Sequence, residues 1–542
     1  MNKKYTKIYE EATPKWYSAD RAREIIQAYN SGAGSSQPAD EFLSASLIPA
    51  ASGSHRDFSY IAPDLPKYIA DHCVACMECV QNCPDSAIWG RVIPVQTLEN
   101  DLANRDAESK NLIESQMAKT TKFWQTYEKK RNKDPQATPP ALFSILVDPT
   151  KCKGCGECVT ACGDHHALEM IRKTKENLPS FLTLWDFYKN IGETSEAYIN
   201  PRLKVDNMLR ESANQFVGGG GSCMGCGETS VIRQLLAATA EHVGQKYGIV
   251  AATGCNTVYG STYPYNPYRV PWTNSLFENA PAVAMGIRAH WDRTGRADQV
   301  LWVFGGDGAM LDIGFQALSR MLASGMNIKA LVLDTQVYSN TGGQASTATY
   351  IGQSAKMSVH GKTIFGKQER RKEIANIAMM HPYTFVAQTI GPMVNHFYKA
   401  VEQALEFNGP ALINVYTTCQ PEHQVADDRS CSQAQLAVES RAFPVFVYHP
   451  EGGPTFASRI SLQGNPSVNR DWHTRKSKTG EEKIDFISFT RTEGRFKQHF
   501  DANGNPSDTI LRSMQDRLDN WRLLQELAGI ENIDLKLCPG EG

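Results

Sequence analysis

The sequence predicts an α/β protein whose main domain contains a doubly wound, mostly parallel sheet, together with a second, smaller α+β domain. Two apolar segments, 299–304 and 328–334, have the continuous hydrophobicity of buried parallel strands, and the helix-like segment 312–324 lies between them. A polar turn follows each strand, at 305–308 and at 335–344. Because parallel strands joined by a crossover helix end at the same edge of a sheet, we expect the two turns to lie together, where α/β proteins bind ligands. Two cysteine motifs of equal spacing predict the smaller domain.

A chain of 542 residues is too long for one hydrophobic core, so we expect about two to four domains. Changes in composition divide the chain into five segments. These are an N-terminal extension at 1–70, a cysteine-rich domain at 71–172, a linker at 173–217, the sheet domain at 218–450 and a C-terminal extension or arm at 451–542.

The formal net charge is −2 at pH 7, which indicates no polyanionic partner such as a nucleic acid. The first residues lead into no apolar segment of a signal peptide, and no apolar run approaches the ~20 residues of a membrane span. We therefore expect a cytoplasmic protein with no membrane partner. In a reducing compartment, the 14 cysteines favour metal ligation over disulfide bonds.

Four cysteines in 73–83 have the spacing C-x2-C-x2-C-x3-C, and the same spacing returns in 152–162. This is the spacing of two-cluster ferredoxins, in which the fourth cysteine of each motif ligates the other cluster. The motifs predict a two-cluster ferredoxin-like α+β domain, and we expect each fourth cysteine to begin a helix. One 4Fe–4S cluster is predicted on Cys73, Cys76, Cys79 and Cys162. The other is predicted on Cys152, Cys155, Cys158 and Cys83. A pair of zinc sites is the alternative, although zinc sites usually use two separate C-x2-C pairs.

The second motif departs from the ferredoxin pattern because Gly163 follows its last cysteine where proline is usual. We interpret the nearby His165 and His166 as surface or outer residues, since four cysteines already complete the site. They could still tune the potential of a cluster. A charged, helix-like insertion at about 100–140 separates the two motifs. Packing on its own domain is favoured for this insertion over a role in docking an external electron carrier.

The turn after the first predicted strand carries Gly306, Asp307 and Gly308. Glycines allow the backbone to approach a phosphate closely, and Asp307 can offer a carboxylate to a divalent cation. The hydroxyl of Thr335 and the carbonyl of Val337, in the second turn, can complete a set of oxygen ligands of the kind that Mg²⁺ prefers. The pattern predicts a diphosphate–magnesium site, with a simple tight turn as the alternative.

These two turns together resemble the thiamine-diphosphate motif, a Gly-Asp-Gly turn followed by a loop with an asparagine, here Asn340. The segment 334–344, Asp-Thr-Gln-Val-Tyr-Ser-Asn-Thr-Gly-Gly-Gln, is similar to the pyruvate:ferredoxin oxidoreductase family, and the resemblance extends over about 65–500. It implies that the cofactor contacts Glu228, Cys255, Gly306, Asp307, Gly308, Ala309, Thr335, Gln336, Val337, Tyr338, Ser339 and Asn340. Among them, Glu228 and Asn340 are expected to take part in catalysis.

The resemblance also implies a third 4Fe–4S cluster, next to the diphosphate, on Cys223, Cys226, Cys255 and Cys419. The last two of these cysteines follow the predicted strands 249–253 and 411–416, so we expect them at the same sheet edge as Asp307. Spacing alone leaves a zinc site or a chance arrangement open. Cys431 and Cys538 are interpreted as ordinary thiols.

The function that the resemblance implies is the oxidative decarboxylation of a 2-oxoacid, with pyruvate as the expected substrate. The acyl group passes to coenzyme A, and electrons pass singly through three 4Fe–4S clusters to ferredoxin or flavodoxin. Thiamine diphosphate and Mg²⁺ complete the expected cofactors. No segment matches a domain that grips the pyrimidine of the cofactor, or one that binds coenzyme A. We therefore expect a second subunit to carry both, in a dimer of heteromers.

Three alternatives are compatible with these motifs. In the first, the same chemistry acts on 2-oxoglutarate, a branched-chain oxoacid or oxalate. In the second, the chain is a polyferredoxin, an electron-transfer subunit without catalysis. In the third, it is a non-redox thiamine-diphosphate lyase whose clusters are structural. The diphosphate motif argues against the second alternative, and two ferredoxin-type motifs in series argue against the third.

Overall fold

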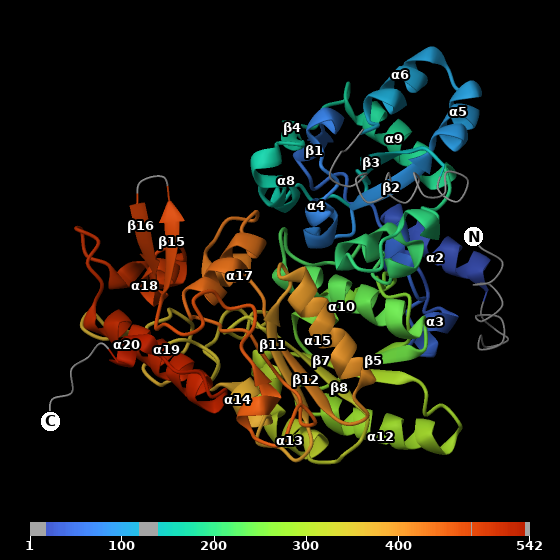
Figure 1. Ribbon diagram of the computed structural model, residues 1–542. Helices are drawn as coiled ribbons and strands as arrows, with labels where there is room; N and C mark the ends of the chain where they lie inside the picture. The colour runs from blue at the N-terminus through green and yellow to red at the C-terminus, as the bar shows by residue number, and fades with distance from the viewer. Residues whose placement is uncertain (1–17, 119–138, 478–479, 537–542) are drawn as a thin grey trace, which may run out of the picture.

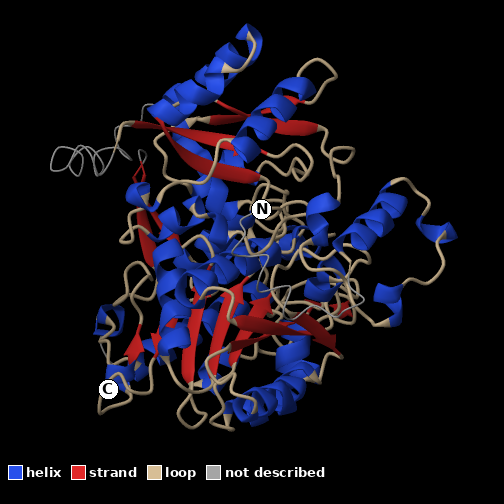
Figure 2. Ribbon diagram, turned by 90° about the vertical axis from the view of Figure 1, so that its right-hand side faces the viewer, coloured by secondary structure: helices blue, strands red, loops and turns tan. Residues whose placement is uncertain are grey.

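The computed structural model describes residues 18–118, 139–477 and 480–536. A cysteine-rich α+β domain with strands β1–β4 lies above a larger α/β domain in Figure 1, and the C-terminal helices lie beside the larger domain. Figure 2 shows strands of the larger domain side by side among helices. Within the described residues, no helix is both long enough and apolar enough to cross a membrane.

The larger domain is built on an eight-stranded sheet whose central strands are parallel. From one edge to the other, the strands are β14 (Ile460–Ser461), β13 (Phe446–Tyr448), β11 (Phe385–Ile390), β12 (Ala411–Tyr416), β8 (Lys329–Asp334), β7 (Val300–Gly306), β5 (Tyr247–Ala252) and β6 (Trp272–Ser275). Neighbouring strands from β11 to β6 pair in parallel, whereas β13 and β14 pair antiparallel. This arrangement confirms the predicted, mostly parallel α/β fold.

Helices cover both faces of the sheet. The helices on one face are α10 (Gly227–Val243) and α15 (Val394–Glu406), and those on the other are α12 (Ala280–Arg293), α13 (Phe315–Leu322) and α14 (Ile374–Ala378). Successive side chains of a strand point to opposite faces. Trp302 and Phe304 of β7 therefore join the first core, whereas Leu301 and Val303 join the second. Burial on both faces explains why the strands are continuous apolar runs in the sequence.

The order of the strands reverses between β5 and β7. The chain passes from β5 outward to β6, returns to β7, and continues to β8 on the other side. Ligands of open α/β sheets bind at such a reversal, beside the carboxyl ends of the strands. Because β5, β7, β8 and β12 are parallel, the turns that follow them share one edge. The fold thus brings Cys255, Asp307, Thr335 and Cys419 to this carboxyl edge.

Two antiparallel strand pairs and two short helices form the core of the cysteine-rich domain. The pairs are β1 (Asp64–Tyr68) with β4 (Leu168–Arg172), and β2 (Ile88–Pro94) with β3 (Ala141–Val147). The helices are α4 (Glu78–Asn82) and α8 (Glu157–Cys162), which pack on each other. The expectation that each fourth cysteine begins a helix is wrong. Each helix begins directly after a residue in the left-handed conformation, before the third cysteine of its motif. The fourth cysteine therefore comes at the end of the helix: Cys83 follows the last residue of α4, and Cys162 is the last residue of α8.

The described part of the insertion at about 100–140 packs on its own domain. The helices of this region are α5 (Val95–Ala103), α6 (Ala107–Ser115) and α9 (Leu178–Asn190). Ile113 of α6 is fully buried in the same apolar cluster as Phe187 of α9. Residues 119–138 lie outside the described residues. Helix α9 belongs to 173–217, the expected linker, so part of that segment contributes to the core of the cysteine-rich domain.

The C-terminal residues, expected to form an extension or arm, pack on the larger domain of their own chain. Strand β14 joins the sheet, and α19 (Asp508–Leu527) buries Trp521 in the same core as α14. The guanidinium carbon of Arg441 lies 4.0 Å from the centre of the Trp521 ring, and the indole N–H donates to the carbonyl oxygen of Arg470 at 2.7 Å. Further helices and strands are α2 (Ala19–Asn30), α3 (Glu41–Ser44), β9 (Val359–His360), β10 (Phe365–Gly366), β15 (His473–Ser477), β16 (Gly480–Ile484), α18 (Phe486–Thr490) and α20 (Ile533–Lys536). Helix α19 is therefore part of the folded core.

We predict that Trp521→Ala lowers the free energy of unfolding by about 3–5 kcal/mol, because it removes a large buried side chain and leaves a cavity. Urea unfolding followed by circular dichroism would measure this loss as a lower transition midpoint. Leu523→Ala is the matched control, since Leu523 lies on the same helix and is 43% exposed, and it should cost no more than about 0.5 kcal/mol. Equal midpoints for the wild type and Trp521→Ala would contradict the packing of α19.

Candidate functional site

Asp307 directly follows β7, and its side chain is fully buried at the carboxyl edge. Its Oδ1 accepts hydrogen bonds from the backbone N–H of Thr335 at 3.3 Å and from the Thr335 hydroxyl at 3.0 Å. The same hydroxyl lies 3.0 Å from the carbonyl oxygen of Val337, and Ser346 donates to Asp307 Oδ2. Burial, and then the nearby carboxylate of Asp334, raise the pKa of Asp307. A divalent cation beside these three oxygens would offset the cost of ionising Asp307.

A second buried carboxylate, that of Asp334, lies behind the loop and has its own cation. Both oxygens of Asp334 accept hydrogen bonds from the guanidinium of Arg371, and both side chains are fully buried. Arg371 Nε also lies 3.3 Å from Glu373, and Glu373 pairs with Arg517 of α19. This chain of alternating charges connects the C-terminal helix to the end of β8.

The loop between Asp334 and Val337 is held in an uncommon backbone conformation. Gln336 has a φ of +56°, in the left-handed region that non-glycine residues rarely adopt. Its side-chain oxygen accepts from Arg495 Nη2 at 3.1 Å, and its carbonyl accepts from Gln353 Nε2 at 3.0 Å. Strained backbone of this kind persists where surrounding contacts fix it, and it is common at ligand sites.

The remaining residues of the predicted cofactor loop lie further from the sheet. Ser339 donates to the Thr335 hydroxyl at 2.9 Å, and the Tyr338 hydroxyl donates to Asp312 Oδ2 at 2.8 Å. A Cβ at Gly308 would lie 2.0 Å from the ring of Tyr338, so only glycine fits there. Asn340, predicted to be catalytic, is exposed at the outer end of the loop. Ala309, in the turn of π-helix after Asp307, is buried.

Glu228 lies in the first turn of α10, and its carboxyl group is buried. The hydroxyl of Tyr259, from α11 (Cys255–Gly260), donates to Glu228 Oε2 at 3.1 Å. Burial raises the pKa of Glu228 to about 7, although the bond from Tyr259 acts in the opposite direction. Burial raises the pKa values of Cys226, Cys255 and Cys419, and the carboxylate of Glu228 raises them further. Glu228 therefore lies among the cysteines of the expected third cluster.

Those cysteines come from separate elements that meet at the carboxyl edge. Cys226 precedes α10, Cys255 is the first residue of α11, and Cys419 precedes α16 (Gln420–His423). Burial is the largest effect on Cys255, and Glu228 and the other three thiols raise its pKa further. The four side chains are thus within electrostatic reach of one another. Cys223 is the exposed member of this set.

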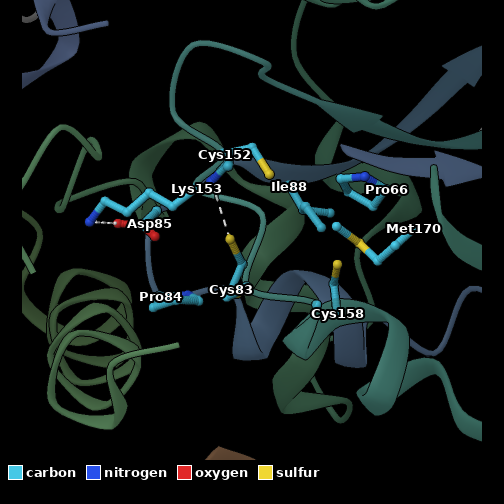
Figure 3. Close-up of a pocket in the computed structure, with 12 residues that line it drawn as sticks. Pro66, Cys83, Pro84, Asp85, Ile88, Cys152, Lys153, Cys158 and Met170 are labelled. Atoms are coloured by element: carbon cyan, nitrogen blue, oxygen red, sulfur yellow. Dashed lines mark hydrogen bonds and ion pairs between the residues drawn. The ribbon is translucent and has the colours of Figure 1, made fainter. Parts of the chain in front are cut away.

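Two pockets in the cysteine-rich domain each collect four cysteines. The lining of one includes Cys83, Cys152, Cys155 and Cys158. The lining of the other includes Cys73, Cys76, Cys79 and Cys162. Figure 3 shows the sulfurs of Cys83, Cys152 and Cys158 pointing into the first pocket, with Ile88 and Met170 beside them. Each pocket combines three cysteines of one motif with the fourth of the other, which is the grouping that the spacing predicts.

The two cysteine loops have the same backbone conformation. The residues before and after the second cysteine have positive φ in both loops: Ala75 at +52°, Met77 at +65°, Gly154 at +80° and Gly156 at +84°. Burial raises the pKa of Cys152 to about 12, so a set of thiolates here needs the positive charge of a metal centre. Within the described residues, no group of three or more His, Cys, Asp or Glu side chains forms a site for a single metal ion.

Of the two cysteines expected to be ordinary thiols, the structure describes one. Cys431 is buried in α17 (Ser430–Glu439), and its backbone N–H donates to Glu157 Oε1 of α8 at 2.9 Å. Cys538 lies outside the described residues. Of the two histidines after the second motif, His165 lines the second pocket and His166 is exposed.

Comparisons with known proteins agree with both sites. Residues 252–415 match the C-terminal TPP-binding domain of thiamine pyrophosphate enzymes, and residues 144–168 match a 4Fe-4S binding domain. Thiamine diphosphate and 4Fe–4S clusters are the cofactors that these two regions bind. The matched segments contain Asp307 and Thr335 in the first case and four of the clustered cysteines, those of the second motif, in the second case.

The pyruvate synthase subunit PorB of Pyrococcus furiosus is 33% identical to this chain over 301 residues, which cover 52% of this chain and 86% of that subunit. This chain belongs to the pyruvate:ferredoxin oxidoreductase family. A second family member, PorB of Pyrococcus horikoshii, is 35% identical over 254 residues, covering 45% of this chain and 75% of that subunit. The pyruvate-flavodoxin oxidoreductase of Rhodospirillum rubrum is 26% identical over 558 residues, covering 87% of this chain and 42% of that enzyme. This family member thus spans about two fifths of the length of that relative.

Several side chains that support the site of this family member were not predicted. Arg371 and Arg495 fix the loop after β8, and His423 Nε2 donates a hydrogen bond to the carbonyl oxygen of Thr335, 2.9 Å away. Ser346 donates to Asp307 from a separate loop. No local pattern in the sequence marks these residues, because each is paired with a group far away along the chain.

We predict that Arg371→Met lowers the free energy of unfolding by about 3–5 kcal/mol, because it leaves the buried carboxylate of Asp334 without its cation. The adjacent variant Arg370→Met is the control. Arg370 has a side chain that is 69% exposed and pairs with Asp519 at the surface, so its loss should cost no more than about 1 kcal/mol. Urea denaturation of both variants would measure the difference, and equal losses would contradict the role given to Arg371.

Proposed function

We propose that this chain is the diphosphate-binding and electron-transfer part of a 2-oxoacid:ferredoxin oxidoreductase. The enzyme oxidises pyruvate, releases carbon dioxide and transfers the acyl group to coenzyme A. One observation carries the proposal: Cys255 and Cys419 follow strands of the sheet at the same edge as the buried oxygens of Asp307, Thr335 and Val337, and Cys226 lies within electrostatic reach of both. The names of the relatives, pyruvate synthase and pyruvate-flavodoxin oxidoreductase, support pyruvate as the substrate and ferredoxin or flavodoxin as the acceptor.

Bound thiamine diphosphate would supply an electron sink for decarboxylation, and the iron–sulfur clusters would accept single electrons. The chain's own residues position these groups. Asp307, the Thr335 hydroxyl and the Val337 carbonyl would hold Mg²⁺ against the diphosphate. The buried carboxyl group of Glu228, which accepts a hydrogen bond from Tyr259, and the exposed Asn340 would contact the cofactor or the substrate.

We assign three 4Fe–4S clusters to the three sets of four cysteines. Two occupy the pockets of the cysteine-rich domain, and the third lies on Cys223, Cys226, Cys255 and Cys419 at the carboxyl edge. Burial raises the pKa of thiols in all three sets, and iron coordination relieves this cost because the thiolate is the ligand. The buried cation site at Asp307 favours a catalytic role over that of a polyferredoxin, which would have no use for it.

A second subunit would supply the part that grips the pyrimidine and the part that binds coenzyme A. This chain covers 42% of the length of the Rhodospirillum rubrum enzyme, and PorB is by its name one subunit of pyruvate synthase. Both observations support a multi-subunit enzyme, which we propose is a dimer of heteromers in the cytoplasm.

We predict about twelve iron atoms and twelve inorganic sulfides per chain after anaerobic purification, because three cubane clusters are proposed. Cys419→Ser should lower the iron content to about eight, since only the set at the carboxyl edge loses a ligand. Cys431→Ser should retain all the iron, because Cys431 is a buried thiol outside the three sets. An iron content near eight atoms per wild-type chain would contradict the assignment of the third cluster.

Asp307→Asn tests the proposed function. Asparagine keeps the acceptor for Thr335 but removes the charge that attracts the cation, so Mg²⁺ affinity should fall by more than about 100-fold. With its partner subunit, thiamine diphosphate, Mg²⁺ and coenzyme A, the wild-type chain should oxidise pyruvate and reduce a viologen dye, and the variant should not. Iron content should stay unchanged, and the exposed Asp298→Asn should behave as wild type. Full cofactor occupancy in Asp307→Asn would overturn the cation site.

A further inference from the structure

Helix α10 links the carboxyl edge of the sheet to the cysteine-rich domain. The helix begins directly after Cys226, its first turn carries Glu228, and it packs on α4. There the hydroxyl of Ser230 donates to the carbonyl of Asn82 at 3.1 Å, and Gln234 Nε2 donates to the carbonyl of Gln81 at 3.2 Å. The last carbonyls of a helix have no partner within it, so α10 supplies the donors that α4 lacks.

Between these two contacts, the guanidinium of Arg233 lies beside the pocket of Cys83. Its Nη1 donates to the carbonyl of Cys83 at 3.2 Å and to that of Val80. The residue is 2% exposed, and its Nη2 has no hydrogen-bond partner within the described residues. Its guanidinium carbon lies 5.7 Å from the centre of the Trp89 ring. A buried, fixed cation is therefore hydrogen-bonded to the backbone of Cys83, one of the four cysteines that line the pocket of Cys83, Cys152, Cys155 and Cys158.

No carboxylate in the described part of the chain lies within ion-pair distance of Arg233. A buried carboxylate in this region, that of Asp85, is ion-paired with Lys153 at 2.7 Å, and the charge of Arg233 also lowers the pKa of Asp85, which burial raises. Burial lowers the pKa of Arg233, and four groups raise it: Cys83, which follows α4, Tyr398 of α15, Tyr188 of α9 and Cys79 of α4. A buried charge is costly unless an opposite charge balances it. The groups that act most strongly on Arg233 are thus thiols and phenols, because Asp85 already has Lys153 as its ion-pair partner. The thiolates of the nearby cysteine set, and the cluster that they would bind, would supply the main counter-charge of Arg233.

We propose that Arg233 is a positioning residue whose fixed charge raises the reduction potential of the cluster on Cys83, Cys152, Cys155 and Cys158. This inference rests on the proposed function. A cluster with four thiolate ligands is an anion and gains one negative charge on reduction, so a nearby cation favours the reduced form. The cluster would take up one electron from a reduced donor cluster, which would be oxidised by the same amount, and no bond would form or break. Arg233 thereby draws the electron away from the cofactor, towards the exit through the cysteine-rich domain.

The test is a reductive titration of the whole chain, purified anaerobically with its clusters and followed by electron paramagnetic resonance. Arg233→Gln should make one cluster harder to reduce by at least tenfold in the ratio of reduced to oxidised form, a shift of about 59 mV for one electron. Arg233→Lys keeps the charge and should shift the potential much less. Ser230→Ala removes a neighbouring contact to α4 without changing charge and should leave all potentials unchanged.

A second variant covers the case in which Arg233→Gln loses iron. Gln81 is fully buried beside Tyr398, at a distance of 3.5 Å between Nε2 and the hydroxyl oxygen. Gln81→Glu would place a carboxylate near Arg233 and should lower the same potential. Unchanged potentials in both Arg233→Gln and Gln81→Glu would show that Arg233 only docks α4. The same conclusion would follow if Arg233→Gln and Arg233→Lys shifted the potential equally, or if Arg233→Gln, Arg233→Lys and Gln81→Glu all lost iron. Wild-type chain without iron would instead overturn the proposed function itself.

Discussion

The hydrogen bonds between α10 and the end of α4 set the geometry on which the rest of the structure depends. Helix α4 has five residues, so its last carbonyls have no helical partners and must be satisfied from outside. Ser230, Arg233 and Gln234 satisfy them from a helix that begins at the carboxyl edge of the sheet. One rigid element therefore fixes the separation between the cysteines of the sheet domain and those of the cysteine-rich domain.

Buried charges in this protein fall into two groups with different physical roles. Asp334 with Arg371 and Asp85 with Lys153 are pairs in which each charge is balanced by the protein. Such pairs cost desolvation but hold loops in place. Asp307 instead has only hydroxyl and amide donors around it. Its charge is left for a cofactor to balance, and groups perturbed in this way concentrate at functional sites.

The sequence predicts the features that depend on a local pattern, and it does not predict contacts between distant segments. Strand β12 coincides with the predicted 411–416, and β8 begins one residue after the predicted start, because both are apolar runs buried on two faces. The grouping of the cysteines also follows from local spacing. The helix predicted at 312–324 begins differently, since a turn of π-helix at Gly308–Ile313 precedes α13. Tyr338 packs against Gly308 there, and this contact joins two segments that a local pattern cannot relate.

Residues that stabilise the site from distant parts of the chain could not be predicted from the sequence either, because their roles depend on how the chain packs. Arg495 and Arg517 come from the C-terminal segment, which has few apolar repeats, yet they reach the loop of Gln336 and the ion pair of Arg371. Their role depends on the position of α19 against the sheet. Burial of Trp521 fixes that position, and a single aromatic residue in a polar helix gives little sign of it.

The central claim is that three redox sites are held in one rigid arrangement around α10. The most direct test is anomalous diffraction at the iron edge, from crystals of the anaerobically purified chain. We expect three separate iron peaks. Two should lie inside the pockets of the cysteine-rich domain, and one should lie between Cys226, Cys255 and Cys419 at the carboxyl edge. Iron peaks confined to the cysteine-rich domain, with Cys226, Cys255 and Cys419 free or bound to zinc, would contradict the account.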